Sequence, residues 1–341
     1  MYSDADLDSA VAAGVLSPAA AAAFRAHAVA RAMPAAVDEE QFRFLTGFND
    51  IFVSIAATLM LGALAWLVGS VAGPFAGLPV AVAAWGLAEY FTLQRRMALP
   101  SILLLLAFAG GVFLTVYGLT PKWGGRSEEA RAAAVALAIT AAAVWAHWRR
   151  FHVPITVAAG VAALVAMTLS LLLSTVPEAR AAIIPLLLVC GLAAFAVAMW
   201  WDMSDRTRTT RRSDIAFWLH LLAAPLIVHP IFSLLGLLGG RATPGEAVAV
   251  LLLYVGLGIV ALAIDRRALM VSALAYVIYA MSTLFREFGA VSLNLAFTAL
   301  IIGSALLLLS AFWHSVRSKV LAALPRELRE RLPVVDRPAK A

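Results

Sequence analysis

The stretch RRSDIAFWLHLLAAPLIVHPIFSLLG, residues 211–236, decides how the rest of the chain is interpreted. It is apolar and long enough to cross the ~30 Å hydrocarbon core of a bilayer as one helix. Yet it carries the histidines His220 and His229 and the prolines Pro225 and Pro230. The other apolar runs contain fewer polar and helix-breaking residues, so this run is the leading candidate for a functional site.

The composition places the whole chain in the membrane class. Of its 341 residues, 63% are hydrophobic and 13% are charged, whereas soluble domains contain about 45–50% apolar and about 25% charged residues. The apolar residues form continuous runs rather than a strict alternation, which excludes a β-barrel. We therefore expect an all-α, polytopic bundle of transmembrane helices.

Ten apolar runs are long enough to be predicted as spans. In chain order they cover residues 51–71, 78–93, 99–119, 130–148, 153–174, 181–201, 213–238, 246–264, 269–285 and 291–313. The predicted bundle occupies residues 51–314. A cytoplasmic helical hairpin and an interfacial helix precede it at residues 1–50, and a basic cytoplasmic tail follows at residues 315–341.

Basic residues are distributed unevenly between the two sides of the predicted bundle. Twenty of the 26 Lys and Arg residues lie in the terminal segments and in the loops after the second, fourth, sixth and eighth spans. The positive-inside rule then places both termini in the cytoplasm. The net charge of +6 reflects this orientation signal and gives no indication of nucleic acid binding.

Arg-Arg pairs recur along the chain and suggest a repeat. They begin at residues 95, 149, 211 and 266, at intervals of 54, 62 and 55 residues, and Trp313-His314 before Arg317 resembles a degenerate fifth copy. One interpretation is a tandem repeat of two-helix hairpins that share one orientation. The other is that any series of hairpins requires basic inner loops.

The two histidines of the run at 213–238 lie on different faces of an ideal helix. At about 100° per residue, Asp214, Trp218, Pro225 and His229 share one face, whereas His220 lies on the opposite side. We expect His229 to be the titrating or hydrogen-bonding group of a cavity. The alternative is a structural histidine bonded to another helix, and this alternative is stronger for His220.

A polar stripe on the span at 269–285 offers a matching face. Its members follow spacings of 4, 3, 4 and 3 residues and are Ser272, Tyr276, Tyr279, Thr283 and Arg286. Such a stripe faces protein or water rather than lipid, and Arg286 at its end would suit an anion. We predict that a cavity between these two spans binds or transports a small solute or ion, with a dry helix interface as the alternative.

The remaining acidic residues are expected to have ordinary roles. Glu89 is a candidate proton site, but an ion pair with Arg95 or Arg96 is the favoured interpretation. Asp265 is expected to pair with the arginines that follow it. Asp202 and Asp205 lie in the longest inner loop and are expected to be solvated, and His147 is expected near water.

Several catalytic and cofactor motifs are absent. The chain has no Walker glycine loop, HExxH, GxSxG or CxxC, and its single cysteine, Cys190, provides no disulfide or zinc pattern. No two histidines at like depth are suited to haem. We therefore expect no metal and no cofactor, and an enzyme is disfavoured.

Two sequence motifs carry a resemblance to known proteins. Leu7-x6-Gly14-x-Leu16-Ser17 in the N-terminal helix pair and Asp265-Arg266-Arg267 between apolar hairpins resemble uncharacterised bacterial polytopic inner-membrane proteins, grouped under domains of unknown function. The resemblance implies an integral inner-membrane protein and no particular activity.

Three functions follow from these observations. The leading one is binding or transport of a small solute or ion. The second is a structural or regulatory role in another membrane complex, with docking through the N-terminal segment and the tail. The third, a membrane-embedded enzyme acting on a lipid or quinone, lacks an acid–base–nucleophile set.

Overall fold

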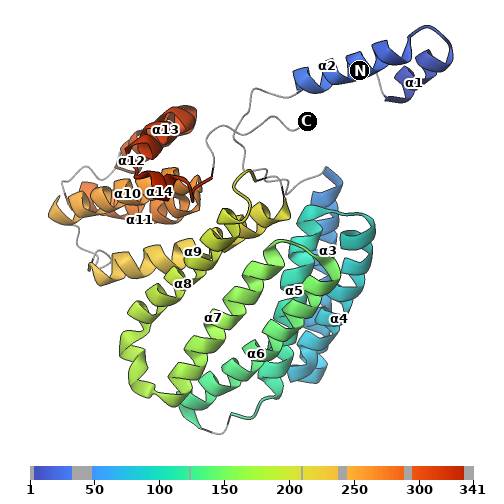
Figure 1. Ribbon diagram of the computed structural model, residues 1–341. Helices are drawn as coiled ribbons and strands as arrows, with labels where there is room; N and C mark the ends of the chain where they lie inside the picture. Colours follow the sequence, from blue (N-terminus) through green and yellow to red (C-terminus); the bar gives the residue numbers. More distant parts are fainter. Residues whose placement is uncertain are drawn as a thin grey trace. The chain divides into compact units, whose positions relative to one another are not determined.

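The computed structural model describes residues 4–32, 48–122, 124–208, 210–236, 244–287 and 294–333. Every regular element in these ranges is a helix (Figure 1), which confirms the predicted all-α class. The chain divides into two compact units, one with residues 1–42 and 336–341 and one with residues 43–335.

The N-terminal unit contains a helical hairpin. Its helices are α1 (Asp4–Ala12) and α2 (Pro18–Ala32). The turn between them uses Gly14 at φ 71°, a left-handed conformation that favours glycine. Ser17 caps α2, because its hydroxyl accepts from the Ala20 N–H at 3.1 Å. Arg25 donates to Asp8 at 2.6 Å and ties the two helices together. The predicted interfacial helix lies outside the described residues.

The second unit contains all the other elements. They are α3 (Phe48–Ala72), η1 (Gly73–Ala76), α4 (Gly77–Ala88), the π-helical turn η2 (Glu89–Gln94), α5 (Ala98–Leu119), α6 (Gly125–Phe151), α7 (Ile155–Thr175), η3 (Pro177–Ala182), α8 (Ile183–Met203), α9 (Arg211–Leu234), α10 (Pro244–Ile264), α11 (Ala268–Glu287), α12 (Asn294–Ala311), α13 (Trp313–Ala323) and α14 (Arg326–Arg329).

Six helices of the described chain are long and apolar enough to cross a membrane. They are α3, α5, α6, α7, α8 with its η3 turn, and α9. Shorter apolar helical segments run through 248–264 and 268–278. A helix overlaps each of the ten predicted ranges. The count of ten stays a prediction, because α4 has only 12 residues before the π-helical turn and the apolar segments found within α10 and α11 are shorter than the six spans.

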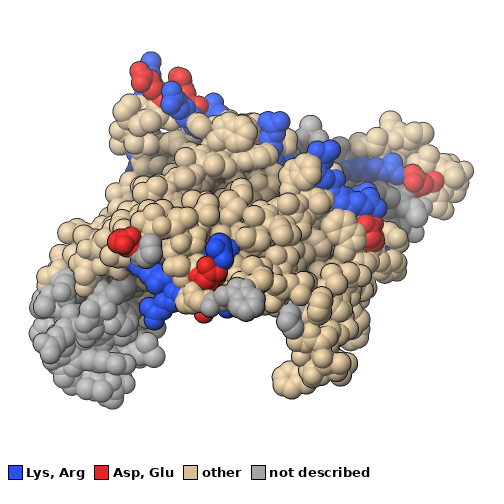
Figure 2. Space-filling view, turned by 90° about the horizontal axis from the view of Figure 1, so that it is seen from below, with Lys and Arg blue, Asp and Glu red and all other residues tan. Residues whose placement is uncertain are grey.

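The surface of this unit is apolar over wide areas. Large hydrophobic side chains are exposed on several helices, among them Trp66 at 80%, Leu307 at 73% and Leu59 at 69%. Figure 2 shows one face on which most residues are uncharged and the charged ones stand in small groups. A lipid environment removes the cost of exposing such a surface, which water would impose.

Four hairpins of the second unit share an unusual turn. Each turn, in the pairs α4–α5, α6–α7, α8–α9 and α10–α11, contains one non-glycine residue with left-handed backbone: Arg96, His152, Arg208 and Asp265, at φ 53–57°. This conformation costs roughly 1–2 kcal/mol. The four residues are separated by 56, 56 and 57 residues, a more regular spacing than that of the Arg-Arg pairs.

Helices α8 and α9 approach closely at one of the prolines. Pro230 has no N–H, so the Leu226 carbonyl four residues earlier lacks its usual helical donor. Gly191 of α8 lies against this carbonyl: a Cβ added at Gly191 would be 2.7 Å from both its carbon and its oxygen. The absence of a side chain at residue 191 therefore allows the two helices to pack at the backbone level.

Gly191→Ala should destabilise the protein, although alanine is the better helix former. The added methyl group must push α8 away from α9, and such overpacking typically costs about 1–3 kcal/mol. Thermal unfolding in detergent measures the loss. Gly256→Ala on α10 is the matched control, because a Cβ there meets nothing within 4 Å. Equal melting temperatures for the two variants would contradict the close approach.

Candidate functional site

The structure brings together the central residues of the two predicted faces. The His229 Nδ1 of α9 lies 2.9 Å from the Tyr276 hydroxyl of α11, and the histidine tautomer decides which group donates. Phe232, one turn after His229, stacks on the Tyr276 ring with the centroids 4.6 Å apart. Both members of the pair are partly buried. The helical angles assigned from the sequence hold because α9 continues through both prolines.

The other residues of the predicted site are less closely associated. Ser272 lies four residues before Tyr276 on α11 and is partly buried. Trp218 packs instead in a cluster with Ala158 of α7 and Ala198 of α8. Asp214 is exposed in the first turn of α9. Three further predicted residues belong to α11, but their side chains lie outside the described part of the chain: Tyr279, Thr283 and Arg286.

His220 faces α8 and is fully buried. Its Nδ1 lies 2.8 Å from the Ala216 carbonyl oxygen of the preceding helical turn and 3.7 Å from Asp202 Oδ2. The ring packs edge-on against Phe195 at 5.3 Å. Its Nε2 has no hydrogen-bond partner among the described residues. His220 therefore borders a buried ionic network at the ends of α8 and α10.

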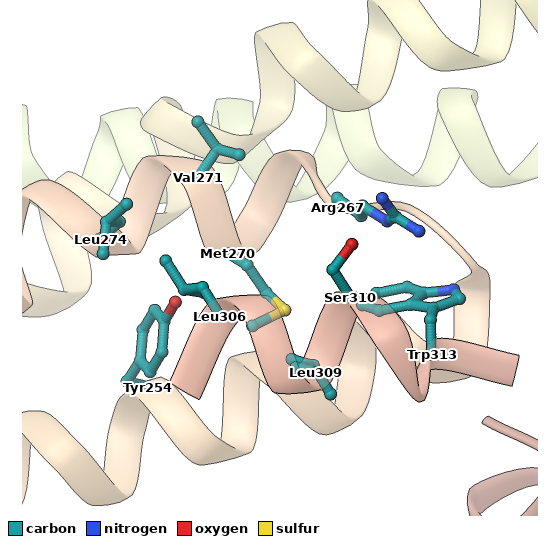
Figure 3. Close-up of a pocket in the computed structure, with 9 residues that line it drawn as sticks. All are labelled: Tyr254, Arg267, Met270, Val271, Leu274, Leu306, Leu309, Ser310 and Trp313. Carbon is teal, nitrogen blue, oxygen red and sulfur yellow. The ribbon is translucent and has the colours of Figure 1, made fainter. Parts of the chain in front are cut away.

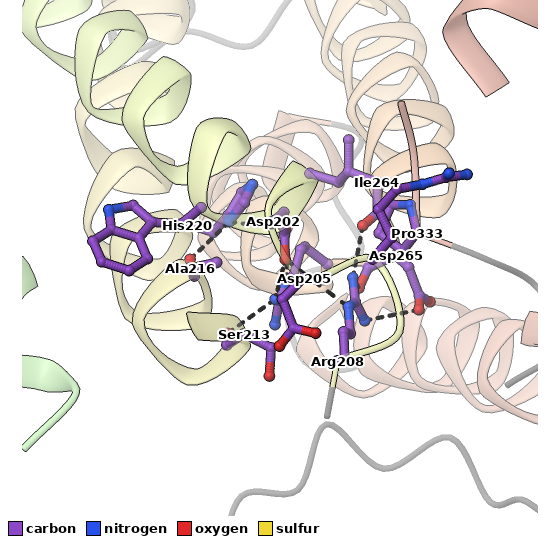
Figure 4. Close-up of polar contacts among 12 residues, drawn as sticks. Asp202, Asp205, Arg208, Ser213, Ala216, His220, Ile264, Asp265 and Pro333 are labelled. Atoms are coloured by element: carbon purple, nitrogen blue, oxygen red, sulfur yellow. Dashed lines mark hydrogen bonds and ion pairs between the residues drawn. The ribbon is translucent and has the colours of Figure 1, made fainter. Parts of the chain in front are cut away.

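The first ion pair of this network joins Asp202, which is labelled in Figure 4, and Arg266. The guanidinium binds the carboxylate through two hydrogen bonds, of 2.5 and 3.2 Å, and donates a third to the Ser213 carbonyl at 3.1 Å. Asp202 is 1% exposed and Arg266 3%. A bidentate pair with an additional hydrogen bond can offset the cost of burying its two charges.

The second ion pair joins two of the left-handed turn residues. Arg208 of the α8–α9 turn donates to Asp265 of the α10–α11 turn at 2.8 Å, and to the carbonyls of Ile264 and Asp265 at 3.0 and 3.1 Å. The second Asp265 oxygen accepts from the Trp313 indole N–H at 2.9 Å. Each turn thus holds the strained conformation of the other.

Asp205 organises the start of α9. Its carboxylate accepts from the backbone N–H and the hydroxyl of Thr210, at 2.9 and 2.7 Å. The Thr210 hydroxyl in turn caps α9 by accepting from the Arg212 N–H.

The expectation that Asp202 and Asp205 are solvated was wrong, since their side chains are buried, with exposures of 1% and 7%. The sequence does contain one signal, namely that the two loops together hold three aspartates near their arginines.

The C-terminal residues close the network. Arg317 of α13 is 1% exposed and donates to the carbonyls of Leu262 and Pro333 at 3.2 and 2.7 Å. Arg206 donates to the Leu332 carbonyl at 3.0 Å. The tail boundary predicted at residue 315 therefore falls inside α13, whose Trp313 and Leu321 are buried in the same core as α10 and α11.

Glu89 also forms an ion pair, but with an unexpected partner. Arg150 of the next hairpin donates two hydrogen bonds to its carboxylate, at 3.0 and 2.7 Å, in place of Arg95 or Arg96. Both side chains are partly exposed. The pair links the first two hairpins as Asp202 and Arg266 link the next two.

His147 was expected near water and is instead fully buried. The rings of Trp85, Phe108 and Phe151 surround it, with centroids 5.8, 5.6 and 4.4 Å away. Neither ring nitrogen has a hydrogen-bond partner among the described residues. The sequence gives no sign of this cage because it is assembled from three helices.

Comparison with protein-family models, curated proteins and solved structures gave no match. In the described part of the chain, no three His, Cys, Asp or Glu side chains are grouped so that they would hold a metal ion. The resemblance to uncharacterised inner-membrane proteins therefore stays an expectation. Function must be argued from the site itself.

Asp202→Asn should be strongly destabilising. The variant keeps the side-chain shape but leaves the buried Arg266 guanidinium without its counter-ion, a loss of about 3–5 kcal/mol. Glu89→Gln breaks the comparable pair at the partly exposed position and should cost about 0–1 kcal/mol. Denaturant unfolding of both purified variants gives the comparison. Equal losses would show that burial of the Asp202–Arg266 pair has no energetic importance.

Proposed function

We propose that this protein is a polytopic inner-membrane protein of bacteria that binds or moves a small solute or ion between α9 and α11. The observation that carries the proposal is the 2.9 Å contact between His229 and Tyr276. Two polar groups from different helices meet there within segments that are otherwise apolar. Intramembrane ionisable residues of this kind commonly mark substrate or ion pathways.

The chemistry of the pair suits transient binding of a proton or a polar solute. An imidazole and a phenol hydroxyl both donate and accept hydrogen bonds, so each can exchange its partner for a solute and remain neutral.

The two prolines of α9 also free backbone acceptors. Pro225 and Pro230 have no N–H, so they leave the Leu221 and Leu226 carbonyls without helical donors. Gly191 packs against the Leu226 carbonyl, whereas Pro225 is exposed. Backbone of this kind is tolerated in membranes where protein or water supplies partners.

We also propose the full topology of ten spans with both termini in the cytoplasm, built from repeated hairpins. The overlap of a helix with every predicted range supports the count. The four left-handed turns at intervals of 56, 56 and 57 residues support duplication, because they coincide with the arginine-rich loops. Basic loops alone would not require the same strained backbone at each turn.

Solute-dependent proton movement tests the site. The full chain is reconstituted into liposomes that contain a pH-sensitive dye, and a panel of amino acids, sugars, carboxylates and alkali cations is added outside. We expect one class to produce a pH change that is abolished in His229→Ala and reduced in Tyr276→Phe. The first variant removes the imidazole, and the second removes the hydroxyl that lies 2.9 Å from it.

Tyr90→Phe is the control for the tyrosine variant, since Tyr90 lies in the η2 turn and its ring packs on Phe91. This variant should transport as the wild type does. Unchanged transport in both site variants, with intact folding in detergent, would remove His229 and Tyr276 from the pathway.

A role as partner of another membrane complex is the second candidate. The observation in its favour is that α1 and α2 belong to a compact unit of their own, held by the Arg25–Asp8 ion pair. A separate helical hairpin is a suitable docking module.

Deletion of residues 1–42 should then abolish co-purification of a stoichiometric membrane partner while the remaining chain still inserts. Affinity purification from native membranes, with the full chain beside the deletion, makes the measurement. Recovery of the same partner with both chains would argue against docking through this unit.

A further inference from the structure

The ion pairs that join the α8–α9 hairpin to the α10–α11 hairpin gather at one end of these helices. This is the inner end, which carries the arginine-rich turns. Arg266 binds Asp202 and the Ser213 carbonyl there. Arg208 binds Asp265 beside them (Figure 4). The two hairpins are therefore fastened to each other through charges at the inner end.

An apolar core lies between these ion pairs and the proposed site. Ala224 of α9 and Ala273 of α11 are fully buried and belong to one cluster of apolar side chains. Sixteen residues of α9 separate Ser213 from His229, a rise of ~24 Å. A solute bound at His229 can reach the inner end between α9 and α11 only where this core and the ion pairs separate.

The buried charges lie close to the exposed inner surface. Asp202 is 1% exposed and Arg266 is 3% exposed. Arg211 and Arg212, at the start of α9 and next to Ser213 of the network, are exposed. A small separation of the two turns is therefore enough to bring water to the buried carboxylate and guanidinium groups.

An ion pair is not the most stable contact for such a position. Apolar side chains of similar volume often give equal or greater stability, because charges lose their hydration when they are buried. When the contact separates, however, water stabilises the exposed charges, whereas it disfavours exposed apolar surface. A charged contact beside water is therefore suited to a junction that opens and closes.

Helix α13 and the residues after it are attached to both hairpins. The Trp313 indole donates to Asp265, and its ring lies beside Arg267 with the guanidinium carbon 4.7 Å from the centroid (Figure 3). Arg206 of the α8–α9 turn donates to the Leu332 carbonyl at 3.0 Å. These contacts reinforce the closed arrangement of the inner end.

We infer that the Asp202–Arg266 and Arg208–Asp265 pairs form the inner gate of the path between α9 and α11. The pairs hold the inner end closed, and their separation lets a solute leave the His229–Tyr276 pair toward the cytoplasm. This inference rests on the proposed function, because a gate requires a solute that passes it. In the conformation described, the gate is closed.

A reporter cysteine on α11 measures the opening of the gate. Cys190 is replaced by alanine, and the partly buried Ser272, four residues before Tyr276, is replaced by cysteine. Inside-out membrane vesicles that contain the full chain are treated with a negatively charged, membrane-impermeant methanethiosulfonate. The labelling rate of Ser272→Cys then follows the fraction of time for which the inner end is open to water.

Two variants move the gate in opposite directions. Asp202→Asn leaves Arg266 without its counter-ion and weakens the closed state, so labelling should be faster by about tenfold or more. The double variant Asp202→Leu with Arg266→Met keeps an apolar contact of similar volume, so the protein should fold and label more slowly than the parent chain. Transport should be reduced in this double variant although its melting temperature is not.

Two controls separate opening of the gate from loss of structure. Glu89→Gln breaks the comparable pair with Arg150, which lies in other hairpins, and should leave the labelling of Ser272→Cys unchanged. Thr168→Cys occupies an exposed position on α7. A thiol that faces lipid stays unreactive toward the charged reagent while the chain is folded, so this variant reports unfolding.

Equal labelling rates in the parent chain, Asp202→Asn and the double variant, with Thr168→Cys unreactive, would overturn the gate. Full transport by the folded double variant would overturn it as well. Either result leaves His229-dependent transport by the wild type, and thus the proposed function, intact. Absence of His229-dependent transport by the wild type would instead refute the proposed function, and the gate with it.

Discussion

The second half of the main unit depends on a buried set of carboxylate–guanidinium bonds. Asp202 and Arg266 form one pair, and Arg208 and Asp265 form the other, with Arg317 directed at backbone carbonyls. Buried charges are tolerated only when geometry and additional hydrogen bonds offset their desolvation. Here the guanidinium groups bind both a carboxylate and peptide oxygens. The network therefore fixes the α8–α9 turn against the α10–α11 turn, and with it the approach of α11 to α9.

Much of this architecture could be predicted from the sequence. Continuous apolar runs locate the helices, because a helix satisfies its own backbone hydrogen bonds and needs only an apolar exterior in lipid. The contact of His229 with Tyr276 agrees with simple helical angles, and so does the separation of His220 from it. These angles hold because neither proline ends α9.

The partners of the charged residues could not be predicted in the same way. Sequence suggests pairs between neighbours, such as Glu89 with Arg95, whereas the observed partners are 61 residues apart for Glu89 and 64 for Asp202. The left-handed residue in each turn redirects the loop, so that its charges meet the adjacent hairpin. Solvation was wrongly expected for Asp202 because a loop position does not reveal whether another turn covers it.

The closure of the network by the Leu332 carbonyl also sets an order of events during synthesis. Arg206 leaves the ribosome 126 residues before its acceptor. At about 5–20 residues per second, the interval is on the order of ten seconds. During that time Arg206 stays hydrated, whereas Asp202 and Arg208 meet their partners earlier, when Asp265 and Arg266 have been made. The hairpin thus inserts first and loses its water later, when the following helices arrive, so dehydration of the charges is a late step of assembly.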